Sequence, residues 1–192
     1  PTVAASRSRA TTRAATRARD ASTCCGICGP SKRKSPAGSA SVFEEPAVSV
    51  VMAVYNGTEF LSEAIESVLG QTFTDFEFII IDDGSTDGTS DIVDRYASAD
   101  PRLRVYRQEH ARLAAALNRG IKLARGKYIA RMDADDVAYP HRFERQVQFF
   151  DKRQDLAVLG GAFELVGSQG QSGIVVRLPG DDATIKLKVA SG

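Results

Sequence analysis

Short apolar segments alternate with segments of helical periodicity along most of this sequence, and this alternation restricts the possible folds more than any other feature. The apolar segments carry large aliphatic side chains at successive positions, so both of their faces must be buried. Strands of this kind belong to a parallel sheet that helices cover on both faces. The sequence therefore predicts an α/β fold with a Rossmann-like, doubly wound and mostly parallel sheet. The expected strands are 48–56 (with its turn), 76–81, 103–107, 127–132 and 156–161, and the expected helices are 58–71, 85–99, 113–124 and 141–153.

The ends of the first two helices carry their own signals. Thr58 is suited to cap the first helix, and Gly70 is suited to end it. Ser85, Thr86 or Asp87 is suited to cap the second helix. We therefore expect both helices to begin close to these polar residues.

Residues 1–46 differ in composition from the rest of the chain. They consist mainly of Ala, Ser, Thr, Arg, Pro and Gly, with hardly any large apolar side chain. Such a segment cannot bury enough surface to offset the entropy lost on ordering. We expect residues 1–46 to be disordered and basic, and residues 47–192 to form one domain.

Charge and cysteine content exclude several functions. The 25 basic and 24 acidic residues give a net charge of +1, which offers no general attraction to nucleic acid. Cys24, Cys25 and Cys28 form one cluster without a second cysteine pair or a nearby His, so neither a zinc site nor a disulfide framework is expected. No run approaches the ~20 apolar residues of a membrane-spanning helix, and no signal peptide is recognisable.

Acidic side chains follow two of the predicted strands at the point where each strand ends. Asp82 and Asp83 follow the second strand, and the sequence DADD at 133–136 follows the fourth. Right-handed crossovers bring the carboxyl ends of parallel strands to one edge of the sheet, where ligands bind. Both acidic clusters should therefore face one crevice. Repulsion between them is tolerable where a cation or hydrogen-bond donors occupy the site.

Carboxylates spaced as Asp-x-Asp provide hard oxygen ligands for Mg²⁺ or Mn²⁺. An acid at a strand end can also accept hydrogen bonds from a base or a ribose. Together these features predict a site for a nucleoside diphosphate bridged by a metal ion. A P-loop is excluded, because the glycine spacing before Lys127 is wrong and Tyr128 stands where Ser or Thr is required. An EF-hand is disfavoured, because the acids of residues 83–94 follow a strand instead of a helix.

Four motifs occur in an order and spacing typical of one family: VSVVMAVYNG, AIESVLGQTFTDFEFIIIDDGSTDGT, ALNRGIKLARGKYIARMDADD and PHRFERQ. From about Val48 to Leu159 the chain resembles the nucleotide-binding half of a family 2 glycosyltransferase with the GT-A fold. The resemblance implies transfer of a sugar, with inversion, from a nucleoside diphosphate donor, for which we expect UDP, to a saccharide or lipid-linked acceptor. Synthesis of a cell-envelope polysaccharide or glycolipid, a cytoplasmic location and peripheral association with the inner face of the membrane are expectations of the same kind.

The resemblance also implies roles for individual residues. Ala53 and Tyr55 would contact the base, and Asp83 would bind it. Asp135 would hold Mn²⁺ or Mg²⁺, and Asp133 would lie beside the ribose or the metal.

One loop departs from the family pattern. His110 and Arg112 stand where the family usually has Asn and Gly, close to the donor. Contact of Arg112 with a phosphate is one interpretation, and impaired donor binding is the other.

An inverting transfer needs a base that takes the proton of the acceptor hydroxyl. In the resembled family this base lies in the acceptor-binding half, so we expect it beyond Gly192 and expect residues 47–192 to be truncated before that half. Asp181 and Asp182 follow a Pro-Gly turn, which suits a helix start better than catalysis. Two alternatives remain open. One is a non-catalytic nucleotide-sugar-binding module or inactive fragment, and the other is a nucleotidyltransferase, which should carry a Gly-rich basic loop that AVYNGTEF does not provide.

Overall fold

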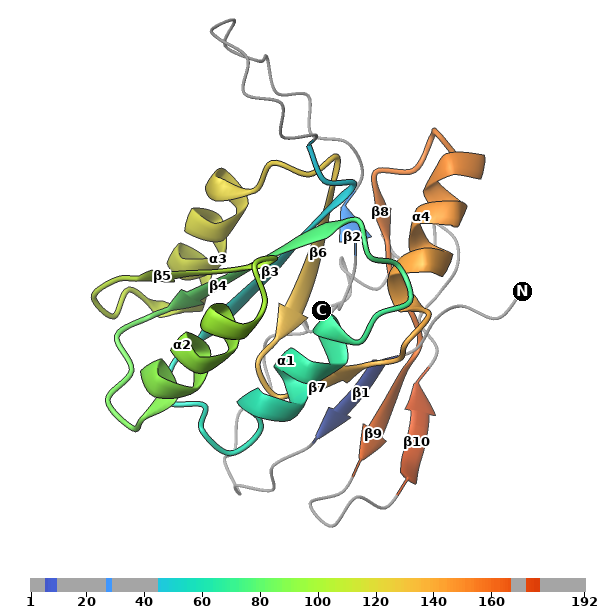
Figure 1. Ribbon diagram of the computed structural model, residues 1–192. Helices are drawn as coiled ribbons and strands as arrows, with labels where there is room; N and C mark the ends of the chain where they lie inside the picture. Colours follow the sequence, from blue (N-terminus) through green and yellow to red (C-terminus); the bar gives the residue numbers. More distant parts are fainter. Residues whose placement is uncertain (1–5, 10–26, 29–44, 167–171, 177–192) are drawn as a thin grey trace, which may run out of the picture.

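The computed structural model describes residues 6–9, 27–28, 45–166 and 172–176, and a parallel sheet forms its centre. The sheet contains β5 (Leu103–Arg107), β4 (Phe76–Asp82), β3 (Val48–Val54) and β6 (Tyr128–Asp133) as neighbours in this order, all parallel (Figure 1). The chain adds β4 and β5 on one side of β3 and then returns to add β6 on the other. This reversal defines a doubly wound sheet, so the predicted fold class is confirmed.

Helices cover both faces of the sheet, as the strand pattern predicted. The helices α1 (Leu61–Leu69), α2 (Thr89–Ala99) and α4 (Arg142–Lys152) pack on one face. The helix α3 (Arg112–Leu123) packs on the other face, opposite α1 and α2 in Figure 1. Among the described residues, no helix combines the length and the apolar character needed to cross a membrane.

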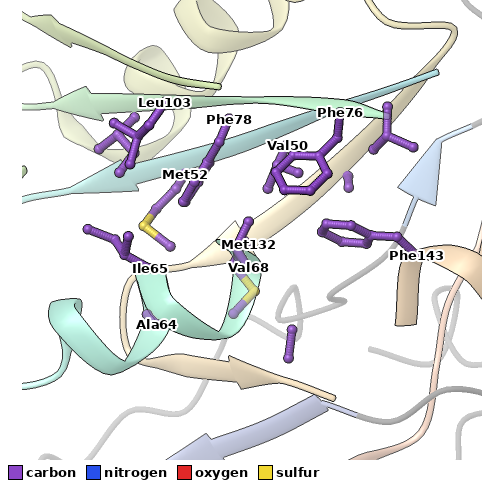
Figure 2. Packing of buried hydrophobic residues seen from close by; sticks show 14 of the residues in the cluster. Val50, Met52, Ala64, Ile65, Val68, Phe76, Phe78, Leu103, Met132 and Phe143 are labelled. Carbon is purple, nitrogen blue, oxygen red and sulfur yellow. The ribbon is translucent and has the colours of Figure 1, made fainter. Parts of the chain in front are cut away.

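The larger hydrophobic cluster lies between the sheet and α1, α2 and α4. Figure 2 shows the side chains of Met52 and Phe78, from β3 and β4, on the face of the sheet toward Ile65 of α1. Phe143 of α4 makes an edge-on ring contact with Phe76, with 5.7 Å between ring centroids. Complete burial of each such side chain contributes roughly 1.5–3 kcal/mol. This layer therefore fixes the strands and the loops that follow them.

Antiparallel strands extend the structure beyond the predicted elements. β2 (Ile27–Cys28) pairs with β6 and with β8 (Val158–Leu159), which completes a six-stranded sheet. A second, four-stranded sheet contains β10 (Ser172–Val176), β9 (Phe163–Val166), β1 (Ser6–Arg9) and β7 (Asp136–Ala138), in that order. Of these strands, only β8 lies within a segment that the sequence predicted as a strand, 156–161.

Two of these strands belong to the segment 1–46, for which the sequence predicted disorder. β1 pairs with β7 and β9, and β2 pairs with β6 and β8, so at these residues the structure differs from the expectation. The physical reason is that pairing with a sheet edge uses backbone groups and does not require large apolar side chains. The other residues of 1–44 lie outside the described residues, and their disorder stays a prediction.

Both helices begin a few residues later than predicted, although Asp87, one of the expected caps of α2, accepts from the N–H of the first residue of that helix, Thr89, at 3.1 Å. α1 begins at Leu61 and α2 at Thr89. Thr58 does not cap α1, because its backbone N–H and its hydroxyl both donate to Asp87 Oδ2, at 3.3 Å and 3.2 Å. The predicted end of α1 at Gly70 is confirmed, since the Gly70 N–H donates to Glu66 O at 2.9 Å.

Gly120 allows α3 to lie close to β3. A Cβ at this position would be 2.5 Å from Cγ1 of Val51, which is buried and stiff at χ1. Replacing Gly by Ala within a helix normally gains about 1 kcal/mol. We expect Gly120→Ala instead to lower the free energy of unfolding by about 1 kcal/mol through overpacking. Urea denaturation measures this change. The double mutant Val51→Ala/Gly120→Ala should cost less than the sum of the single changes, and strict additivity would contradict the close approach.

Candidate functional site

A cleft of about 580 Å³ opens between the carboxyl ends of β3 and β6, where the strand order reverses. Two segments provide most of its lining, 53–57 at the end of β3 and 131–136 at the end of β6. Glu59, Phe60 and Leu113 complete it. Doubly wound sheets bind their ligands at such a reversal of strand order. The cleft therefore lies at the edge of the sheet that the sequence indicated.

Not all predicted site residues line this cleft. Those that do are Ala53, Tyr55, Asp133 and Asp135. Asp83 follows β4, one strand further from the reversal, and Arg112 is exposed at the start of α3. The structure thus divides the predicted site into a cleft and a neighbouring loop region that contains Asp83.

The loops that follow β3 and β4 are joined by hydrogen bonds. Asn56 Oδ1 accepts from the Thr86 N–H at 2.8 Å, and the Asn56 N–H donates to Ser85 Oγ at 3.0 Å. Thr58 binds Asp87 in the same way, as described above. Asn56 adopts a positive φ of 51°, which Asn tolerates better than most residues. The wall of the cleft that carries Tyr55 is therefore fixed to the loop after β4.

Asp82 has a structural role in the same loop. Its Oδ1 accepts from the Ser85 N–H at 3.0 Å, and its Oδ2 accepts from the Ser90 hydroxyl at 2.5 Å. These contacts connect the end of β4 with the first turn of α2. In the sequence DDGSTD, Asp82 and Asp87 thus hold the loop together through hydrogen bonds. Asp83 is the acid of this sequence that was predicted to bind the ligand.

Asp83 is buried beneath the loop that precedes α3. Its Oδ1 accepts from Gln108 Nε2 at 2.6 Å and from the Ala111 N–H at 2.9 Å, and its Oδ2 lies 3.0 Å from His110 Nδ1. Gly84 permits this approach, because a Cβ there would be 3.0 Å from the His110 backbone nitrogen. Burial alone would raise the pKa of Asp83, but these hydrogen bonds and the charge of His110 hold it below its ordinary value. Both oxygens of an ionised carboxylate are therefore in use.

His110 connects Asp83 with the cleft. Its ring lies against the ring of Tyr55, with 4.1 Å between centroids and an interplanar angle of 34°. Tyr55 is half exposed and lines the cleft. Tyr55 and Asp83, which were predicted to contact the nucleotide base, are thus linked through His110. In the sequence, His110 was marked only as a departure from the family pattern.

Arg112 occupies a backbone conformation that favours glycine. Its φ is +69°, in the left-handed region, which costs a residue with a side chain roughly 1–2 kcal/mol. The Gly that the resemblance implies at this position would adopt this conformation without that cost. Because Arg112 is exposed and its neighbour Leu113 is the residue that lines the cleft, a contact of Arg112 with a phosphate stays a prediction.

Asp133 forms an ion pair that the sequence analysis missed. Arg131 Nη2 lies 2.8 Å from Asp133 Oδ1 and 3.1 Å from its Oδ2. The two residues are separated by one position in β6, so their side chains point to the same face of the sheet. That spacing is the sequence signal from which the pair could have been inferred.

Asp135 presents an exposed carboxylate on the acidic wall of the cleft. It is exposed, and within the described residues its side chain has no partner other than its own backbone amide. Partial desolvation by the surrounding protein raises the pKa of Asp135, and the nearby Asp133 carboxylate adds to this shift. A divalent cation would relieve both effects. The donor chemistry at Asp135 therefore fits Mg²⁺ or Mn²⁺.

A metal ion would need further ligands. In the described part of the chain, no three His, Cys, Asp or Glu side chains converge as a ready metal site. Mg²⁺ is often bound by one or two carboxylates together with substrate phosphates and water. The cleft suits this second arrangement, with Asp135 as the carboxylate available for it.

A buried arginine supports the end of β6. Arg142 of α4 is 1% exposed and donates to Arg131 O at 2.9 Å through Nη2 and to Met132 Sδ at 3.2 Å through Nη1. Its Nε donates to Gln146 Oε1 at 3.2 Å. The motif that contains Arg142 thus holds the strand that carries the acidic residues.

A doubly wound sheet with an acidic cleft at the reversal of its strand order is typical of nucleotide-binding α/β proteins. The family described as glycosyl transferase family 2 matches residues 49–170, and the chain belongs to this family. Its sheet and covering helices match the GT-A fold of the solved glycosyltransferases compared below.

Two relatives from Bacillus subtilis (strain 168) illustrate the similarity. The chain is 44% identical over 117 residues to the putative glycosyltransferase EpsE. The matched region covers 60% of this chain and 42% of EpsE. It is 40% identical over 121 residues to the putative glycosyltransferase EpsH. This matched region covers 63% of this chain and 35% of EpsH. The chain therefore spans less than half the length of the proteins that it matches.

Solved structures show the same fold. S. aureus TarS in complex with UDP-GlcNAc is similar with a TM-score of 0.53 and 28% identity, over 56% of this chain and 32% of that chain. The mannosyltransferase PcManGT from Pyrobaculum calidifontis, in complex with GDP-Man and Mn²⁺, is similar with a TM-score of 0.50 and 28% identity, over 55% of this chain and 32% of that chain.

Proposed function

We propose that this chain forms the donor-binding part of an inverting glycosyltransferase. The enzyme would move a sugar from a nucleoside diphosphate donor, for which we propose UDP, to a polysaccharide or glycolipid acceptor. The observation that carries the proposal is the cleft between β3 and β6, with Tyr55 on one wall and Asp133 and Asp135 on the other. Membership of glycosyl transferase family 2 supports it. The nucleotide sugars bound by TarS and PcManGT support a donor of this class.

The two walls suggest how a nucleotide would lie. Tyr55, with Ala53 beside it in the lining, would contact the base, and Asp83 would accept a hydrogen bond from a base N–H. Because His110 lies against Tyr55 and close to Asp83 Oδ2, the base would have to displace the His110 side chain to reach that oxygen. The diphosphate would then lie toward residues 131–136.

The acidic wall would receive the diphosphate together with a divalent ion. Asp135 would hold Mn²⁺ or Mg²⁺, and Asp133 would lie beside the ribose or the ion. A bound ion of this kind neutralises the charge that develops on a departing diphosphate. Arg131, which also lines the cleft, adds a positive charge near the same place.

The acceptor side of the reaction completes the proposal. We place the catalytic base beyond Gly192, and Asp181 and Asp182 lie outside the described residues. Synthesis of a cell-envelope polysaccharide or glycolipid, at the cytoplasmic face of a membrane, is the corresponding biological role. Sequence similarity to EpsE and EpsH, both described as putative glycosyltransferases, supports the reaction class.

Replacement of Asp83 by Ala tests the base-binding part of the proposal. We expect Asp83→Ala to weaken binding of uridine and of UDP by the same factor, about fivefold or ~1 kcal/mol, because its partner would be the base. Calorimetric titration of the chain with each ligand measures both affinities. Asp94→Ala, which removes an exposed carboxylate paired with Arg107, serves as the control and should leave both affinities unchanged.

The outcomes separate the assignment of Asp83 from the function itself. If only UDP binding weakened, Asp83 would belong to the phosphate and metal region. If the unaltered chain bound no nucleoside diphosphate or nucleotide sugar, with or without Mn²⁺, the donor-binding proposal would be wrong.

A further inference from the structure

The ion pair between Arg131 and Asp133 lies within the cleft and is not explained by donor binding alone. A single guanidinium nitrogen contacts both carboxylate oxygens, at 2.8 Å and 3.1 Å. The side chains retain only 25% and 17% of their exposure, respectively. An ion pair that is partly shielded from water is stronger than one at the open surface. The pair is therefore a defined feature of the cleft.

This pair bears on which carboxylate a metal ion could reach. Both oxygens of Asp133 accept hydrogen bonds from Arg131, so an approaching cation would meet a positive charge and would have to compete for the same oxygens. Asp135 is exposed, and among the described residues it has no such ion pair. Glu59 and Asp136 also line the cleft, but in the described part of the chain no three acidic, His or Cys side chains converge on one point, so Asp135 needs further oxygen ligands to bind Mg²⁺ or Mn²⁺ tightly.

We propose that Arg131 prevents Asp133 from binding a free divalent ion, so that the ion enters the cleft together with the donor diphosphate. The phosphate oxygens would supply the missing ligands, and their negative charge would offset the repulsion between the ion and Arg131. A guanidinium group is also well suited to contact phosphate. Arg131 is thus a positioning residue that acts through Asp133. This inference deepens the proposed function and rests on it.

Direct binding of Mn²⁺ to the whole chain without nucleotide tests the inference, with electron paramagnetic resonance as the measurement. Arg131→Met keeps an unbranched apolar stem and removes the charge. We expect it to bind free Mn²⁺ about fivefold more tightly than the unaltered chain, because Asp133 becomes available as a second ligand. Arg131→Lys retains a positive charge and should bind Mn²⁺ as weakly as the unaltered chain.

A double mutant shows whether the gain passes through Asp133. Arg131→Met/Asp133→Asn should lose the added affinity of Arg131→Met. A second readout is the factor by which saturating UDP increases the affinity for Mn²⁺. This factor should be smaller in Arg131→Met than in the unaltered chain, because Asp133 is then available as a ligand before UDP binds. Since binding of the two ligands is reciprocally coupled, Mn²⁺ should increase the affinity for UDP by the same smaller factor.

The inference is overturned if Arg131→Met binds free Mn²⁺ no more tightly than the unaltered chain, or if the double mutant keeps the gain. Circular dichroism checks that each variant is folded, and Arg131→Gln replaces Arg131→Met if the latter does not fold. Failure of the donor-binding proposal is recognised separately, because it would abolish the effect of UDP and leave the titration with Mn²⁺ alone interpretable.

Discussion

Asp135→Asn is expected to lower the Mn²⁺-dependent affinity for UDP at least about tenfold, or ~1.4 kcal/mol. Asn keeps the size of the side chain but offers a neutral oxygen, which is a poorer ligand for a hard cation. Without the ion, the phosphates would face Asp133 and Asp136, and only the charge of Arg131 in the cleft lining would offset the repulsion. Binding of uridine should stay nearly the same, because uridine has no phosphate. Calorimetric titration with both ligands, in Mn²⁺ and in a chelator, measures the four affinities.

A matched control separates metal binding from general electrostatics. Glu59→Gln removes one negative charge from another part of the cleft lining and should not reduce the gain in UDP affinity that Mn²⁺ produces. If Asp135→Asn kept that gain in full, or if the unaltered chain bound UDP equally well in chelator, the assignment of the metal to Asp135 would fail.

The stability of Asp135→Asn provides an independent check. The pKa of Asp135 is raised in the folded chain, so the ionised carboxylate is less favourable there than in the unfolded chain. At neutral pH this group therefore reduces stability. Asn carries no charge. We therefore expect the melting temperature of Asp135→Asn to equal or exceed that of the unaltered chain.

Glu77→Ala is expected to lower the free energy of unfolding by about 3 kcal/mol, the largest effect on stability predicted for this chain. Glu77 of β4 has a side chain that is only 4% exposed. It accepts from the Ser49 hydroxyl, from the Arg125 N–H and from Arg104 Nη1, each at 2.7 Å. The expected loss lies at the lower end for a broken buried pair, because the arginine side chains are partly exposed and water can solvate them. Urea denaturation at pH 7 measures it.

The pH dependence of this effect has a defined sign. Burial alone would raise the pKa of Glu77, but the hydrogen bonds from Ser49, Arg125 and Arg104 lower it below its ordinary value of 4.5. The stabilisation from Glu77 is therefore complete above that value and is lost as the pH falls through the lowered pKa. We expect the stability difference between the unaltered chain and Glu77→Gln to shrink below about pH 4.5.

Arg125→Ala provides the comparison for Glu77. The Arg125 side chain is about half exposed, and its backbone N–H would still donate to Glu77. A loss of no more than about 1 kcal/mol is expected. An equal loss in Arg125→Ala and Glu77→Ala, or a difference between Glu77→Gln and the unaltered chain that is the same at pH 3 and pH 7, would show that the buried carboxylate is not the source of the stability.

The parallel strands could be predicted because their signal is local. Val50, Ile80 and Met132 belong to continuous apolar runs and are buried. Such runs are typical of strands that are covered on both faces of a parallel sheet. Asp133 and Asp135 could also be placed, since the end of a parallel strand fixes the edge of the sheet at which they lie.

Contacts between distant segments could not be predicted in the same way. Thr58 is a good helix cap by composition, but it binds Asp87, which only the paired strands bring near. The contact of His110 with Tyr55 likewise depends on the loop before α3 folding over β4. The strand at Asp136–Ala138 was missed because three residues provide no periodicity.

Hydrogen bonds join the loops after β3 and β4, so a change in the sequence of one loop requires a matching change in the other. A graft that replaced residues 55–60 alone would remove the acceptor of the Thr86 N–H and the donors to Asp87. Base preference should therefore be transferable between relatives only when both loops are exchanged together. The wall at 131–136 comes from one continuous segment, so it can diversify through single substitutions while the opposite wall changes in compensated pairs.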